Sequence, residues 1–153
     1  MIVALVASAC TAAALSAPPV ELRFADMFVA PIGAAGLQPT RALVDLDGHR
    51  VAIGGYLVRR HAGAGSILLA PVPVSLDDED EGLADDLPAA TLRVRLPTGF
   101  DDAPIRWVAG RQRLVGTLCI GPEREPDGRF LPMSLLLDEA SVRALANIRK
   151  DTR

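Results

Sequence analysis

The clearest alternation of hydrophobic and polar residues lies in residues 91–96, where leucine and valine alternate with Arg93 and Arg95. This period of two predicts a strand with one face buried and the arginines outside. Four further stretches are rich in β-branched residues and leucine and are bounded by turn residues: 50–59, 66–70, 111–120 and 129–137. The pattern therefore predicts five short strands.

The turns between these stretches carry their own signal. Asp47-Gly48 precedes the first strand and Asp127-Gly128 joins the last two, and Asp-Gly tolerates the positive φ that tight turns require. Gly54 and Gly55 allow a bulge and indicate that the first strand curls. Five short strands with glycine-softened bends predict a mainly β fold, a small five-stranded OB-like barrel.

A short C-terminal α-helix follows the last strand. Asp138 is a candidate N-cap, and Val142, Leu145 and Ile148 fall on one helix face. The basic residues at its end suit the helix dipole: Arg149, Lys150 and Arg153. The chain then divides into a signal or lipoprotein signal segment (1–17), a leader (18–44) and the barrel domain with its helix (45–150).

Residues 2–17 carry no charge and are mostly Ala, Val and Leu. The run is shorter than the roughly 20 residues of a membrane-spanning helix and fits an export signal. Two processing routes stay open. Residues 6–10 are similar to a lipobox in which Cys10 takes the lipid, although Ala7 stands where leucine is usual; the alternative is plain cleavage after Ala17. A buried N-terminal helix is a third interpretation, which the lack of polar positions disfavours.

Composition and charge narrow the classes of protein to which this chain can belong. The chain has 153 residues, half of them hydrophobic but only 4% aromatic, which fits one domain with an aliphatic core. Its net charge of −3 includes seven carboxylates within ten residues, so the rest of the chain carries +4, too little to predict nucleic-acid binding. Those carboxylates are Asp77, Asp78, Glu79, Asp80, Glu81, Asp85 and Asp86.

This acidic loop has three interpretations. It is a solvated surface loop, a docking surface for a basic partner, or a site for a divalent cation. The loop lacks the alternating Asp/Asn ligands and the fixed glycine of a calcium loop. We therefore assign no metal ligands and predict no cofactor.

Catalytic patterns are missing from the sequence. No serine lies in a nucleophile elbow, and there is no glycine-rich phosphate loop, Cys-x-x-Cys or His-Glu-x-x-His. His49 and His61 flank the first strand, roughly 30 Å apart if it is extended, so they share no metal. Cys119 has no partner if Cys10 is lipidated or removed, and then it is a small buried residue of a strand. We predict that the protein is not an enzyme.

Three stretches together resemble an uncharacterised family of bacterial periplasmic proteins and lipoproteins with an OB-like barrel: residues 46–51 with 55–58, residues 110–118, and residues 127–128 followed by 134–137. The resemblance covers residues 45–142. Family members commonly carry a Cys-Ile-His segment before a proline run, where this chain has Ala70-Pro71-Val72-Pro73-Val74. The resemblance therefore implies a fold, an envelope location and an accessory role beside ABC-type export systems, but no ligand or metal role for that segment.

Our leading hypothesis is a non-catalytic accessory or binding protein of the bacterial cell envelope. It is periplasmic or lipid-anchored through Cys10, meets the membrane only through that lipid, and has a protein partner such as a transport complex. The alternative is an ion- or small-ligand-binding module that uses residues 77–86. A cytosolic nucleic-acid-binding OB domain, stacking bases on Tyr56 and Trp107, is the third hypothesis.

Overall fold

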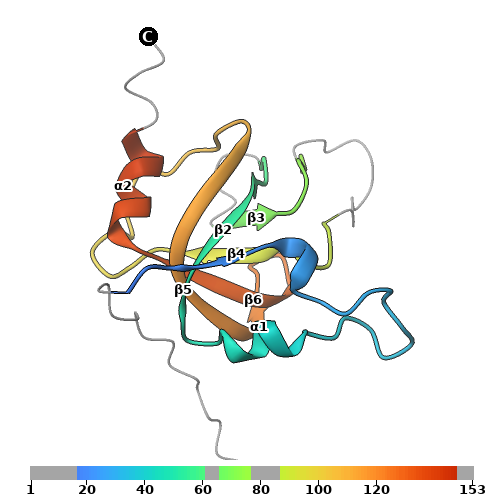
Figure 1. The fold of residues 1–153 in the computed structure, drawn as a ribbon. Coiled ribbons are helices and arrows are strands. Elements are labelled where there is room, and N and C mark those ends of the chain that lie inside the picture. Colours follow the sequence, from blue (N-terminus) through green and yellow to red (C-terminus); the bar gives the residue numbers. More distant parts are fainter. Residues whose placement is uncertain (1–16, 61–65, 77–86, 148–153) are drawn as a thin grey trace, which may run out of the picture.

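The computed structural model describes residues 17–60, 66–76 and 87–147, which form a mainly β fold with a short C-terminal helix. Within these residues six strands belong to one sheet (Figure 1). In chain order the elements are β1 (Val20–Leu22), η1 (Phe24–Asp26), α1 (Arg41–Asp45), β2 (Arg50–Leu57), β3 (Ile67–Ala70), β4 (Leu92–Arg95), β5 (Arg111–Arg124), β6 (Phe130–Leu137) and α2 (Glu139–Asn147). The predicted mainly β class and C-terminal helix are confirmed.

β2 is hydrogen-bonded along both of its edges. One edge pairs antiparallel with β5 over residues 50–56. The other edge pairs in parallel with β1 over residues 51–53 and antiparallel with β3 at residues 56 and 57. β3 then pairs with β4, β4 in parallel with β6, and β6 with β5, so the order of pairings returns to β2. β1 is one strand more than the five predicted.

The glycine pair in β2 lies where one edge of the strand passes from β1 to β3. The bulge that Gly54 and Gly55 allow does not form against β5, because the pairing of residues 50–56 with that strand runs without a register shift. Close packing explains Gly55 instead: a Cβ there would lie 2.9 Å from the carbonyl oxygen of Ala70 and 2.8 Å from the ring of Phe24. The irregularity lies in β5, between Ile120 and Glu123.

The core is aliphatic and draws on every strand and both α-helices. Met27 and Leu43, exposed by 0% and 1%, come from residues 18–44, which we assigned to a leader. Thr40 fixes the start of α1, because its Oγ1 accepts a hydrogen bond from the backbone N–H of Leu43 at 3.2 Å. The segment before β2 therefore packs into the same core as the strands.

Both Asp-Gly turns are confirmed. Gly48 and Gly128 have φ values of 73° and 90°. The carboxylate of Asp47 also accepts a hydrogen bond from the backbone N–H of Ile120 at 2.8 Å, which ties this turn to β5. The alternation in β4 is confirmed as well, with its leucine and valine buried and Arg95 exposed.

Candidate ligand pocket

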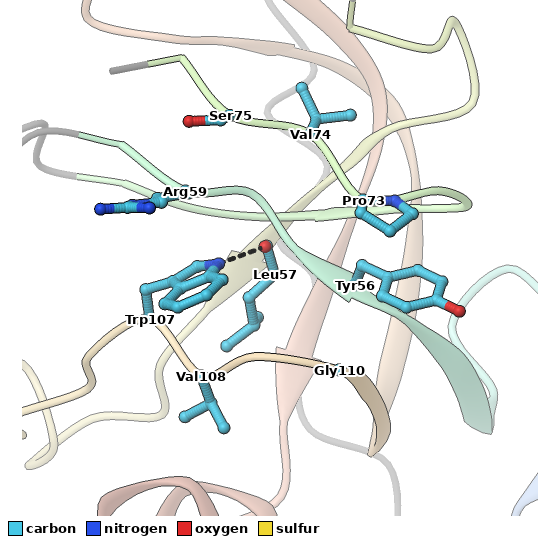
Figure 2. Close-up of a pocket in the computed structure, with 9 residues that line it drawn as sticks. All are labelled: Tyr56, Leu57, Arg59, Pro73, Val74, Ser75, Trp107, Val108 and Gly110. Carbon is cyan, nitrogen blue, oxygen red and sulfur yellow. Dashed lines mark hydrogen bonds between the residues drawn. The ribbon is translucent and has the colours of Figure 1, made fainter. Parts of the chain in front are cut away.

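A pocket of about 360 Å³ opens beside the end of β2. Its walls are the last residues of that strand, the segment 73–75 that follows β3, and the loop 107–110 that precedes β5 (Figure 2). The described residues that line it are Tyr56, Leu57, Arg59, Pro73, Val74, Ser75, Trp107, Val108 and Gly110. Its volume lies at the small end of the range for ligand sites, which suits a small molecule.

Trp107 is fixed by a hydrogen bond to the backbone. Its Nε1–H donates to the carbonyl oxygen of Leu57 at 2.9 Å, one residue beyond the point where pairing with β5 stops at Tyr56 (Figure 2). The indole N–H therefore has its hydrogen-bond partner in the backbone of β2. The side chain is 47% exposed although its polar atom is satisfied, so what it presents outward is apolar ring surface.

Arg59 packs against the same ring. Its guanidinium carbon lies 5.4 Å from the centroid of the Trp107 ring, which is within cation–π range. The backbone of Arg59 holds the opposite wall, because its N–H donates to Val74 at 2.9 Å and its carbonyl accepts from Leu76 at 2.8 Å. In Figure 2, Arg59 and Ser75 lie at one end of the pocket and the phenol of Tyr56 lies at the other.

A second polar cluster surrounds Glu125, whose side chain is only 1% exposed. The hydroxyl of Ser66 donates to its Oε2, and Arg60 Nη1 lies 3.5 Å from that oxygen and donates to Ser66 at 2.6 Å. Arg93 Nε lies 3.5 Å from Oε1, an ion-pair distance that does not have hydrogen-bond geometry. The cluster ties the region after β2 to β4 and β5, and its charges are compensated internally, which points to a structural role.

Another ion pair shifts the titration of its members. Arg23 donates to Asp26 at 2.7 and 3.2 Å. These hydrogen bonds lower the pKa of the Asp26 carboxyl and raise the pKa of Arg23, and the mutual charge attraction adds to both shifts. Both side chains are exposed, and neither lines the pocket.

Most of the site residues predicted from the sequence lie outside the described residues. These are Cys10 and the acidic residues Asp77, Asp78, Glu79, Asp80, Glu81, Asp85 and Asp86. Among the residues that the structure describes, no group of three or more His, Cys, Asp and Glu side chains could hold a metal. His49 is exposed, as expected, and its Nδ1 lies 3.0 Å from the carbonyl oxygen of Asp47.

Cys119 is half-buried in β5 and disulfide-bonded. We expected an unpaired thiol at this position only if Cys10 is lipidated or removed. Cys10 is the other cysteine of the chain. Within one chain, a Cys10 that carries a lipid on its sulfur has no thiol left for a disulfide, so the two states exclude each other.

The chain has no match to any protein-family model, curated protein or solved structure. The resemblance to periplasmic proteins therefore stays a prediction. In residues 17–60, 66–76 and 87–147, no helix has the length and apolar character needed to cross a bilayer.

From the sequence, Trp107 and Tyr56 were named only as rings on which nucleic-acid bases could stack. Glu125 was not predicted as a functional residue. The signal for the pocket was a lone tryptophan in a loop between prolines and glycine. No local signal marks the Glu125 cluster, because Ser66 and Glu125 are 59 residues apart in the chain.

Proposed function

We propose that this protein is a non-catalytic binding module of the bacterial cell envelope, and that the pocket at Trp107 is its ligand site. The observation that carries the proposal is the state of Trp107, a half-exposed indole whose N–H is already bonded to Leu57. A large apolar surface held in one orientation beside an arginine is typical of ligand pockets, which combine apolar walls with few polar groups.

We propose in addition that the fold is an OB-like barrel. The order of strand pairings in the sheet supports this, with the barrel built from β2, β3, β4, β5 and β6. Their pairings form a closed order, with β4 and β6 in parallel. OB folds commonly bind ligands on their second and third strands, between two flanking loops. In this chain the corresponding strands, β3 and β4, lie beside the paired charges of Glu125. The apolar surface suited to a ligand lies instead at Trp107.

A disulfide at Cys119 is stable only in an oxidising compartment such as the periplasm, and within one chain it requires that Cys10 is neither lipidated nor removed. The possible states of the N-terminus can be distinguished in protein purified from a cell-envelope fraction. The protein is labelled with a maleimide, with and without reductant, and its mass is measured. A chain with an internal disulfide reacts only after reduction and then at two thiols. A chain lipidated at Cys10 has gained the mass of the lipid and reacts at Cys119, and a chain cleaved after Ala17 begins at Pro18 with one cysteine. Cytosolic protein with both thiols free would contradict export.

Binding can be tested with the intrinsic fluorescence of Trp107, the only tryptophan of the chain. The probe is 4-phenyl-1-butanol, a neutral molecule with an apolar body, titrated into the full chain. We expect a saturable change in emission. Tyr56→Ala removes one wall and should weaken binding several-fold, whereas Phe130→Ala removes an aromatic that is 68% exposed outside the pocket and should not.

The ligand site would be refuted if neither this probe nor its charged analogues, 4-phenylbutyrate and 4-phenylbutylamine, changed the emission of Trp107 saturably. The association with a transport system follows from the family resemblance alone. The mature chain would have to capture an envelope transporter, and a pocket variant would have to lose this capture. That result would connect the pocket with the transport system.

A further inference from the structure

We propose that the loop between η1 and α1 inserts into the surface of a lipid bilayer, with Ile32 as its main point of contact. The inference goes beyond the proposed function, because the loop lines no part of the Trp107 pocket and its contact with lipid does not require a ligand there. It also departs from our expectation that the chain meets the membrane only through an attached lipid. The observation that carries it is a run of exposed residues without polar side chains.

The composition of this loop, residues 27–40, is unlike that of an ordinary surface loop. It has no charged side chain, and residues 30–37 have no polar side chain at all. Residues 29–36 are all exposed, with Val29 at 48% and Ile32 at 60%. Surface loops are normally polar, and a run of exposed apolar residues of this length marks a place of contact.

Hydrogen bonds of the backbone close the loop at both of its ends. At its base, the N–H of Thr40 donates to the carbonyl oxygen of the fully buried Met27 at 2.9 Å. At its far end, the N–H of Gly36 donates to Gly33 at 3.0 Å. Figure 1 shows the loop extending away from the sheet between η1 and α1. The apolar residues are thus presented on an ordered projection, so contact costs little conformational entropy.

A lipid bilayer fits this surface better than a protein partner or a second copy of the chain. Stable protein interfaces take about 20–30 residues from each side, form about one hydrogen bond per 100–200 Å² and are anchored by Trp, Tyr or Arg. Residues 30–37 contain none of these anchors and no polar side chain. A bilayer surface requires only apolar contact, and at shallow depth the backbone groups of the loop keep their access to water.

A tryptophan introduced into the loop reports insertion directly. The full-length Ile32→Trp variant is mixed with phosphatidylcholine vesicles whose acyl chains are brominated and quench any tryptophan that they contact. The wild-type chain gives the background of Trp107, and Val72→Trp is the matched control, since Val72 is 50% exposed outside the loop. We expect Ile32→Trp to lose more emission than the wild type and the control, and its remaining emission to shift to shorter wavelength.

A charge at the same position should oppose insertion. Ile32→Asp should weaken the affinity of the full chain for phosphatidylcholine vesicles about tenfold, whereas Val72→Asp should leave it within about twofold. Because the loop is uncharged, the loss should be the same at low and high salt and on vesicles that contain phosphatidylglycerol.

Equal quenching of Ile32→Trp and Val72→Trp overturns the proposal, and so does an unchanged affinity of Ile32→Asp. A loss of affinity in Ile32→Asp without quenching in Ile32→Trp overturns it as well, because the loop would then act without touching lipid. Ile32 is exposed, so both variants should keep the wild-type unfolding midpoint. Titration of 4-phenyl-1-butanol without vesicles tests the Trp107 pocket separately, and Ile32→Asp should leave that titration unchanged.

Discussion

Glu125 is the one charged residue among the buried residues of the described chain. Its partners come from distant positions: Arg60 after β2, Ser66 before β3 and Arg93 in β4. A carboxylate taken out of water is tolerable only where cations and donors compensate it, and here two guanidiniums and one hydroxyl do so. Read along the sequence, each of these residues looks like an ordinary polar or charged surface residue. This is why sequence reasoning missed the cluster.

Glu125→Gln tests whether this charge stabilises the fold. The amide keeps the shape and an acceptor for Ser66, but it removes the buried carboxylate that Arg60 and Arg93 share. Among the described residues, Arg60 then keeps Asp127 at 3.6 Å and Arg93 keeps Glu123 at 3.7 Å as ion-pair partners. We expect a loss of about 2–3 kcal/mol in the free energy of unfolding, measured by urea denaturation. Glu123→Gln is the control, since Glu123 is 28% exposed, and it should cost well under half as much. Equal effects of the two variants would contradict a special role for the buried site.

The stabilisation that the ion pair of Arg23 and Asp26 contributes should depend on pH. The pKa of Asp26 is lowered from its ordinary value by the hydrogen bond from Arg23. A folded-state pKa below the unfolded one means that the pair stabilises the fold fully above the unfolded pKa and stops doing so as the pH falls through the folded pKa. Arg23→Gln should therefore move the Asp26 midpoint upward in an NMR titration of its carboxyl. An unchanged midpoint would show that the pair does not form in solution.

At the scale of the elements, local patterns predicted most of what is seen. The alternation in β4 and the two Asp-Gly turns are properties of neighbouring residues, so sequence reasoning located them correctly. Gly54 and Gly55 show the limit of such reasoning. A strand glycine permits either a bulge or close packing, and only the neighbours of Gly55, which include Ala70 and Phe24, determine which. Those neighbours belong to other parts of the chain.

Gly116 in β5 is a second case of close packing, and it supplies a test. A Cβ at this position would collide with the backbone carbonyl of Leu136 in β6, which cannot rotate away as a side chain can. We expect Gly116→Ala to cost about 2–3 kcal/mol in the free energy of unfolding. Gly33→Ala is the matched control, since no atom lies within 4 Å of its Cβ position, and it should be near neutral. A neutral Gly116→Ala would mean that β5 and β6 pack less closely than described.

At the scale of the whole molecule, β2 connects the parts of the fold. It pairs with β1, β3 and β5, and these pairings join the segment before β2 to the rest of the sheet. The pocket depends on the same strand, because Tyr56, Leu57 and Arg59 lie at or just beyond its end. Long-range pairing of this kind cannot be read from hydrophobic periodicity, which predicts elements but not their partners. The pocket and the hydrophobic core therefore both depend on β2.

The segment before β2 should accordingly unfold together with the sheet and not as a separate leader. Met27 is fully buried in the main core, whereas Val29, two residues later, is 48% exposed. Met27→Ala leaves a cavity and should lower the free energy of unfolding by about 2–5 kcal/mol, while Val29→Ala should change it by less than about 0.5 kcal/mol. Circular dichroism of the sheet and the emission of Trp107 should report the same shifted midpoint, as a single cooperative unit requires. If Met27→Ala left both midpoints in place, residues 18–44 would be an appendage and the domain would begin at β2.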